Sequence, residues 1–293
     1  MSREFAMRFI FSTGSLYNYS IDRVFALAAE AGFEGIEMMV DHRWDTRQLD
    51  YLRYLMDSHA LTIPALHSPF SRNCQGWGET EVGAIARTAE LAAELDARVV
   101  VHHLPTRYGA AFLQTASRSL LLPNPFDTLN RQYADWLTES YAELQARTDV
   151  LLCIENLPAQ RFMGVRVNPA RWNPHSQATL GDITRFPHIT LDTTHLGTWG
   201  LDPVEAYNFW GQRVKHVHLS NFDGSEHRRP EDGALKLDAL LARMAADGYG
   251  HSISLELQPD ALEAGAPDSR VVELLRGSLH YCLQAVRQEE SSA

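Results

Sequence analysis

The stretch Val150-Leu151-Leu152-Cys153-Ile154-Glu155-Asn156 has the character of a buried β-strand that ends in a carboxylate. An apolar run of this length without alternation is typical of a strand covered on both faces, as in a parallel sheet. A carboxylate at the end of such a strand is costly to bury unless it is paired or bound to a cation. This stretch therefore predicts a parallel sheet, and it leaves Glu155 as either a hydrogen-bonded structural carboxylate or a metal ligand.

Seven further apolar segments resemble this one and alternate with longer segments of helical period. The expected strands are Arg8–Ser12, Gly35–Val40, Thr62–His67, Arg98–His102, Val150–Glu155, Ile189–Asp192, Lys215–Leu219 and Ser252–Leu257. The expected helices are Ile21–Ala31, Asp45–His59, Glu79–Leu95, Pro125–Thr148, Thr179–Phe186, Asp202–Trp210, Lys236–Asp247 and Asp268–Gln288. This alternation predicts an α/β fold, a single (β/α)8 TIM barrel domain over residues 1–293, with a frayed tail at 289–293.

An open, doubly wound sheet uses the same alternation and is the alternative fold. Against it, no GxGxxG follows the first strand, where the chain reads Ser12-Thr13-Gly14-Ser15-Leu16. Two connections are long, Leu104–Phe126 after the fourth strand and Leu157–Ala178 after the fifth. In a barrel both belong to the C-terminal face, where active sites are built, so we expect extended loops there.

The composition restricts the partners and the compartment. A net charge of −11 opposes wholesale binding to nucleic acid or to anionic membranes. The 3 cysteines are dispersed, and no apolar run approaches the ~20 residues of a membrane span. We expect a cytoplasmic protein with a small-molecule substrate and without nucleic-acid or membrane partners. The exposed helices of a barrel also suit a homo-oligomer.

Four consecutive strands carry metal-binding side chains at or near their ends. Besides Glu155, these are Asp192 in the sixth strand, His218 in the seventh and Glu256 in the eighth. The carboxyl ends of parallel barrel strands meet at one face, so these side chains should converge. Three converging carboxylates repel one another, and a divalent cation offsets that repulsion. The sequence therefore predicts a metal site made by these four residues.

Further histidines are expected as ligands near this group. They are His67 at the end of the third strand, His195 after Asp192, His227 after the seventh strand, and His102. Strand alternation lets only one of His102 and His103 face inward, and the residues themselves leave the choice open. In the seventh strand we expect His218 to face the site and His216 the helices. The imidazole-rich set favours manganese or zinc over magnesium or cobalt.

Arginines occur in both long loops, which contain no Asp or Glu. Arg107 and Arg118 lie in the first loop, and Arg161, Arg166 and Arg171 lie in the second. Surface loops often carry arginine, which is the plain structural interpretation. The functional interpretation is a cationic mouth for phosphate or carboxylate, with the three arginines of the second loop as candidate substrate-binding residues.

At these strand ends the chain resembles the xylose-isomerase-like TIM barrel superfamily over nearly its whole length. The resemblance is carried by Ile-Glu-Asn at 154–156, Asp-Thr-x-His at 192–195, His-Val-His at 216–218 and Leu-Glu-Leu at 255–257. The superfamily includes sugar and sugar phosphate isomerases and epimerases, and abasic-site nucleases of the endonuclease IV type (AP endonuclease family 2). The resemblance implies an enzyme, but it does not choose the reaction.

The epimerase branch implies one divalent metal held by Glu155, Asp192, His218 and Glu256. The two glutamates would then be catalytic, taking and returning a proton through a metal-stabilised enediolate, and His195 would position a sugar oxygen. The arginine that this branch has a few residues after His218 is missing, since Asn221-Phe222-Asp223-Gly224 occupies that stretch. A sugar or sugar phosphate isomerase or epimerase of carbohydrate metabolism is our first hypothesis.

The nuclease branch implies up to three zinc ions, with His67, His102 and His227 as added ligands. Such a site would activate a metal-bound hydroxide for attack on a phosphodiester. Ser225 stands where this branch has Asp, which removes one ligand of a third ion. A multi-zinc hydrolase of a small phosphodiester or an abasic nucleic acid is the second hypothesis, and a non-catalytic metal-binding barrel is the third.

Overall fold

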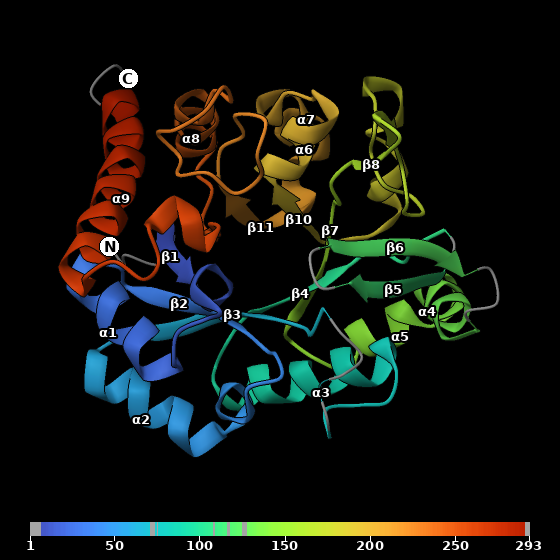
Figure 1. Cartoon of the computed structure of the whole chain (residues 1–293), viewed down its shortest axis with the longest axis horizontal. Helices are drawn as coiled ribbons and strands as arrows, with labels where there is room; N and C mark the ends of the chain where they lie inside the picture. The colour runs from blue at the N-terminus through green and yellow to red at the C-terminus, as the bar shows by residue number, and fades with distance from the viewer. Residues whose placement is uncertain are drawn as a thin grey trace.

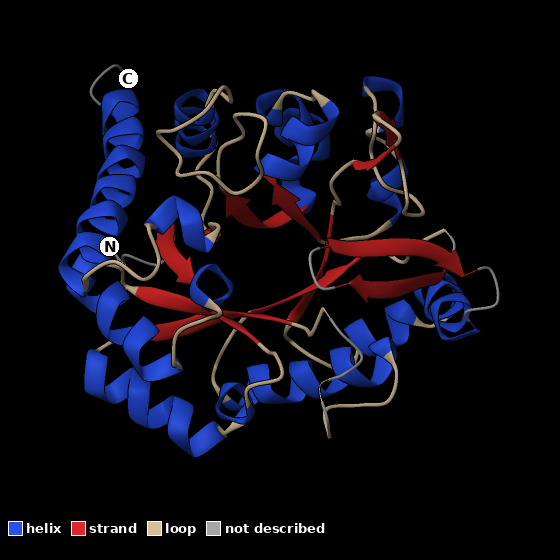
Figure 2. Ribbon diagram, in the orientation of Figure 1, coloured by secondary structure: helices blue, strands red, loops and turns tan. Residues whose placement is uncertain are grey.

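Eight parallel strands close into a barrel in the computed structural model of the chain, which describes residues 7–70, 74, 76–107, 109–115, 118–124 and 128–290 (Figures 1 and 2). The barrel strands are β1 (Arg8–Ser12), β2 (Gly35–Met39), β3 (Thr62–His67), β4 (Val99–His103), β7 (Leu151–Glu155), β10 (Ile189–Asp192), β11 (Val214–Leu219) and β12 (Ser252–Leu255). They pair in the closed order β1-β12-β11-β10-β7-β4-β3-β2. The predicted (β/α)8 barrel is confirmed, and the open doubly wound sheet is wrong.

The strand ends set the positions of the candidate ligands. β1, β3 and β10 have the predicted bounds, because each apolar run stops abruptly. β4 runs one residue further than expected and includes His103. β12 ends at Leu255, so Glu256 is the first residue after its strand.

Helices surround the strands, with α1, α2 and α3 on one side of the barrel and α6, α7 and α8 on the other (Figure 1). The α-helices are α1 (Ile21–Ala31), α2 (Leu49–His59), α3 (Glu81–Glu94), α4 (Thr128–Glu139), α5 (Tyr141–Gln145), α6 (Thr193–Trp199), α7 (Pro203–Trp210), α8 (Leu237–Ala246) and α9 (Asp268–Glu290). The 3-10 helices are η1 (Thr13–Leu16), η2 (Trp44–Arg47), η3 (Gln177–Thr179), η4 (Asp182–Arg185), η5 (Gly211–Arg213) and η6 (Pro259–Leu262).

Two predicted helices differ from the structure. The expected helix 125–148 is divided into α4 and α5, and residues 125–127 lie outside the described residues. The expected helix 179–186 is replaced by the short turns η3 and η4. At the C-terminus, α9 extends to Glu290, into the segment predicted to fray, while residues 291–293 lie outside the described residues.

The two long loops each contain a two-stranded antiparallel sheet. β5 (Gly109–Thr115) pairs with β6 (Arg118–Asn124), and β8 (Gln160–Phe162) pairs with β9 (Val165–Val167). The β5–β6 hairpin projects from the side of the barrel at the right of Figure 1. The loops are therefore extended as predicted, but they contain regular secondary structure.

The core has an outer and an inner part. Between strands and helices, each helix buries one apolar face; in α1 this face includes Val24, Phe25 and Ala28, and Gly32 ends the helix with a φ of 98°. Inside the barrel, a small apolar cluster fills the lumen with Ile10, Ala65, Val99, Val101 and Cys153. Alternation along β4 and β7 then places His103 and Glu155 on the same inner face, nearer the C-terminal end.

Within the described part of the chain, no helix combines the length and the apolar character that a membrane crossing requires.

Candidate metal centre

Glu155, Asp192, His218 and Glu256 converge at the C-terminal end of the barrel. Each of them offers one ligand atom, and these atoms all lie within 4.8 Å of one another. Nδ1 of His218 lies 2.9 Å from Oε2 of Glu256, 3.3 Å from Oε1 of Glu155 and 3.8 Å from Oδ2 of Asp192. All four residues are buried. One imidazole nitrogen thus faces three carboxylates, as the strand ends predict.

The electrostatics of this group favour a cation. Burial raises the pKa of Asp192 to about 7, and the neighbouring charges of Glu155 and Glu256 act in the same direction. Burial also opposes ionisation of Glu256, but the charge of His218 lowers the pKa of Glu256 to about 2. In turn Glu256, Glu37 and Glu155 raise the pKa of His218 well above its usual value, against the effect of burial. The site therefore holds protons where a divalent ion would supply the same positive charge.

The two carboxylate oxygens of Asp192 indicate whether these residues fit a metal ion. Its Oδ1 accepts a 2.7 Å hydrogen bond from the His195 backbone N–H at the start of α6. Its Oδ2 is buried and has no hydrogen-bond partner among the described residues. A buried carboxylate oxygen without a partner is costly, and a divalent cation removes that cost. The donor set thus fits a divalent metal ion.

His67 and His103 approach the same centre from the neighbouring strands β3 and β4. Nε2 of each ring lies 3.2 Å from Oε2 of Glu155, and the three residues form a second potential ligand group. Nδ1 of His67 donates to the Ser68 carbonyl at 2.7 Å. Its Nε2 therefore faces the carboxylate with a lone pair, unless the ring takes a second proton or binds a cation.

The structure does not bring His102, a predicted ligand, to this centre. His102 faces outward, and its Nδ1 donates at 2.8 Å to the hydroxyl of Tyr133, which donates in turn to the His103 carbonyl at 2.6 Å. Burial, together with the nearby rings of His103 and His67, lowers the pKa of His102 to about 3. Side chains alternate along a strand, so the inward histidine of β4 is His103.

A third potential ligand group consists of Asp192, His195 and His227. Nδ1 of His195 lies 3.6 Å from Oδ2 of Asp192. His227 lies in the loop after β11 with a left-handed backbone (φ 56°), and its Nδ1 lies 3.2 Å from the Glu256 carbonyl oxygen. Ser225 is exposed, and its N–H donates to the Asp223 side chain in the same loop. The structure therefore brings His195 and His227 to the site but not Ser225.

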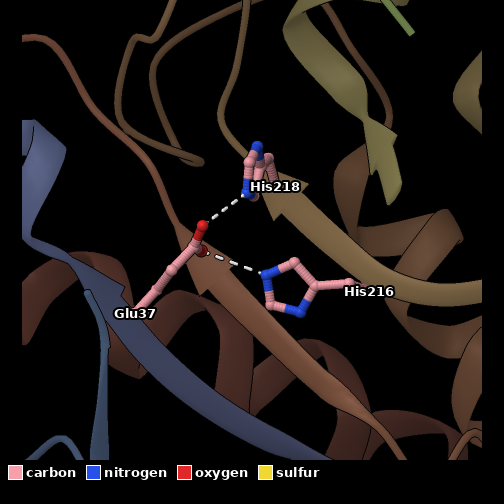
Figure 3. A group of neighbouring side chains, drawn as sticks. All are labelled: Glu37, His216 and His218. Carbon is pink, nitrogen blue, oxygen red and sulfur yellow. Dashed lines mark hydrogen bonds and ion pairs between the residues drawn. The ribbon is translucent and has the colours of Figure 1, made fainter. Parts of the chain in front are cut away.

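Two residues of the cluster were not predicted, Glu37 and His216. Both are fully buried inside the barrel, where Glu37 lies between the rings of His216 and His218 (Figure 3). The expectation that His216 faces the helices is wrong, because residues two apart on a strand point to the same face. Glu37 had a visible signal, a carboxylate within the apolar run of β2.

A cavity of about 470 Å³ adjoins the metal centre at His227 and Glu256. Tyr17, Met39 and Phe70 give it apolar walls, and Asp41 and Gln258 add polar groups. Phe70 also packs on the ring of His67, with centroids 4.7 Å apart. Among the described residues that line the cavity there is no lysine or arginine.

The predicted arginines lie elsewhere. Arg161 and Arg166 are cross-strand partners in the β8–β9 hairpin, and both are exposed. Nη1 of Arg166 donates to the Trp199 carbonyl at 2.8 Å. Arg171 is half-buried after this hairpin. None of the three belongs to the described cavity lining, and their role in substrate binding stays a prediction.

The fold and the site together define the class of this protein. It is a parallel (β/α)8 barrel with carboxylates and histidines gathered into a candidate metal centre at its C-terminal end. The chain belongs to the xylose isomerase-like TIM barrel family, whose sequence model matches residues 25–276. The resemblance inferred from the strand-end motifs is therefore confirmed.

Similar proteins extend over nearly the whole chain. An uncharacterised protein of Mycobacterium leprae is 25% identical over 292 residues, which cover 93% of this chain and 97% of the relative. The structure is similar to D-allulose 3-epimerase from Methylomonas sp., with a TM-score of 0.64 and 14% identity over 95% of this chain and 97% of that one. It is also similar to an AP endonuclease of family 2 from Brucella melitensis, with a TM-score of 0.60 and 18% identity over 86% and 93% of the two chains. These structural likenesses show the fold.

Proposed function

We propose that the chain is a divalent-metal-dependent enzyme that isomerises or epimerises a sugar or sugar phosphate. The observation that carries this proposal is the position of Glu155 and Glu256, which approach Nδ1 of His218 at 3.3 and 2.9 Å beside the cavity. An epimerase needs two groups that exchange a proton with the carbon next to a carbonyl. Two carboxylates beside one metal position meet that need.

The cation, the two glutamates and His195 would have separate roles in the reaction. A bound divalent cation would supply Lewis-acid polarisation of the sugar carbonyl. Glu256 is ionised at neutral pH because the charge of His218 lowers its pKa against the effect of burial, and the same holds for Glu155. One carboxylate would therefore accept the proton from the substrate carbon, and the other glutamate, protonated from solvent, would deliver a proton to the opposite face. His195 would orient a sugar hydroxyl.

The described cavity favours an uncharged sugar over a phosphate-bearing substrate. Asp41 and Gln258 offer hydrogen-bonding groups for hydroxyls, while Tyr17 and Phe70 offer aromatic surfaces for the C–H face of a sugar. The described lining contains no lysine or arginine to pair with a phosphate, and the Asp41 carboxylate in it is already ion-paired with Arg43. D-allulose 3-epimerase and other sugar epimerases share the fold, which supports an open-chain ketose as the substrate.

Phosphodiester hydrolysis is the second candidate, and one observation favours it. The groups around His67 and His103 and around His195 and His227 share Glu155 and Asp192 with the four-residue group. Linked ligand groups of this kind suit two or three ions, as expected for hydrolysis by a metal-bound hydroxide. The similarity to an AP endonuclease of family 2 agrees with this chemistry.

Metal content and turnover measured together separate the two candidates. The protein is purified without chelators or added metal, and its ions are counted by elemental analysis. About one manganese, cobalt or magnesium per chain, with solvent deuterium entering a ketose next to its carbonyl, supports the isomerase or epimerase. Two or more zinc ions and cleavage of a small phosphodiester support the hydrolase. Full activity after chelation contradicts both.

A further inference from the structure

Glu37 spans the interior of the barrel. Its Oε1 lies 2.9 Å from Nε2 of His218, and its Oε2 lies 3.0 Å from Nε2 of His216 (Figure 3). Glu37 belongs to β2 and both histidines belong to β11, which are separated in the barrel by β1 and β12. All three side chains are fully buried. These contacts are therefore long-range bonds across the lumen and not part of the strand pairing.

The contacts decide which nitrogens carry protons. An ionised carboxylate only accepts hydrogen bonds, so both Nε2 atoms donate to Glu37. The proton on Nε2 of His218 leaves Nδ1 as its ligand atom, and Nδ1 is the nitrogen that faces Glu155, Asp192 and Glu256. A histidine that binds a metal through one nitrogen commonly donates its other N–H to a carboxylate, which fixes the tautomer and the ring orientation.

We propose that Glu37 is a positioning residue that holds His218 in the Nε2–H tautomer, so that Nδ1 binds the metal. His216 occupies the second oxygen of Glu37 and keeps the carboxylate from rotating away. The inference rests on the metal centre of the proposed function. It adds a residue that touches neither the ion nor the substrate and yet sets the affinity of the site.

Glu37, His216 and His218 are also close enough to form a ligand group of their own. We favour hydrogen bonds because each carboxylate oxygen has one nitrogen at 2.9 or 3.0 Å, the usual length of such a bond. An ion bound directly by Glu37 would contradict the positioning role. The two arrangements differ in which nitrogen of His218 binds the metal.

The Glu37→Gln variant keeps the shape of the side chain and removes its charge. Its amide can present either its oxygen or its NH2 group to Nε2 of His218, so it no longer selects the Nε2–H tautomer, and it lacks the negative charge that makes the ring a stronger ligand. Titration calorimetry with Co²⁺ should show metal binding about 10 to 100 times weaker than in the wild type. Glu34→Gln makes the same charge change at an exposed position and should leave the affinity unchanged. Wild-type affinity in Glu37→Gln would overturn the proposal.

A measurement on the wild type keeps the test independent of how well the variant folds. Long-range ¹H–¹⁵N correlation spectra of the Zn²⁺-loaded protein should show His218 with a protonated Nε2 and a coordinated Nδ1. Coordination through Nε2 would overturn the proposal. Zn²⁺ bound through Nδ1 in a protein that epimerises no ketose would contradict the proposed function and leave the positioning role intact. A wild type that binds neither ion would overturn both.

Discussion

The side chain of Asn156 holds the backbone of Asp192 through both of its hydrogen-bonding groups. Nδ2 of Asn156 donates to the Asp192 carbonyl at 3.0 Å, and Oδ1 accepts from the Asp192 N–H at 2.9 Å. Asn156 is fully buried directly after β7, and its own carbonyl accepts from Nδ1 of His195 at 2.8 Å. The side-chain amide of Asn156 thus extends the hydrogen bonding between β7 and β10 past their last backbone–backbone hydrogen bond. It fixes the position of Asp192 relative to Glu155.

Replacement of Asn156 by Asp should weaken both the fold and the metal site. The new oxygen would face the Asp192 carbonyl in place of a donor, leaving a buried acceptor unpaired at a cost of roughly 1–3 kcal/mol. Urea unfolding measures this loss, and calorimetric titration measures the accompanying loss of metal affinity. Asn208→Asp, at an exposed position on α7, is the matched control. Equal stability of both variants would contradict the role of the amide.

Glu256→Gln should remove catalysis and spare the fold. The amide can still offer an oxygen to a cation but cannot accept a proton from the substrate, so turnover should fall roughly 10²- to 10⁴-fold. Elemental analysis and thermal unfolding verify that metal and structure are retained, and Glu90→Gln on the exposed face of α3 is the control. An unchanged rate would refute the acid–base role. A wild type without activity would instead indicate a metal-binding barrel without catalysis.

The adjacent histidines of β4 provide a paired test of the inward face. His103→Gln should lower affinity for an ion shared with His67 and Glu155 by about tenfold or more, since it removes a group beside the metal. His102→Gln changes only the contact with Tyr133 outside the barrel and should leave the metal content unchanged. Elemental analysis of the two variants, purified in parallel, distinguishes them. The opposite order of effects would mean that β4 presents its other face.

Metal binding should release protons. In the metal-free protein burial raises the pKa of Asp192 to about 7, and the surrounding carboxylates raise the pKa of His218 well above its usual value despite burial. Both groups hold protons below these pKa values, and a cation must displace them. Apparent affinity should therefore rise with pH between about pH 6 and pH 8, by about tenfold per unit for each proton released. Calorimetry in buffers of different ionisation enthalpy counts the protons, and pH-independent affinity would contradict this picture.

Most of the barrel could be predicted because each strand is a short apolar run with an abrupt end. α6 was missed because Thr193–Trp199 has no apolar period; it begins where Asp192 caps it and ends at Gly200, with a φ of 75°. The β8–β9 hairpin was missed because its turn places Met163 and Gly164 at φ values of 49° and 82°. Methionine rarely adopts that conformation, so the sequence shows no ordinary turn signal.

The candidate site could be predicted where a candidate ligand marks the end of a strand, as with Glu155 and Asp192. It could not be predicted where the contact crosses the lumen, because nothing near Glu37 in the sequence indicates that β11 lies opposite. The choice between His102 and His103 failed for another reason. Val99, Val100 and Val101 are all apolar and buried. The strand therefore lacks the alternation of polar and apolar residues that would show which side chains face the barrel interior.

The candidate metal centre and the cavity beside it come from different parts of the chain. The ligands lie at strand ends, whereas Tyr17, Asp41, Phe70 and Gln258 lie in the connections that follow β1, β2, β3 and β12. If the proposed function holds, laboratory evolution toward new sugars can therefore be confined to a library at these four positions. Such a library varies the shape of the cavity while every variant keeps the same candidate metal ligands and the same two glutamates, so its members can be ranked by selectivity alone.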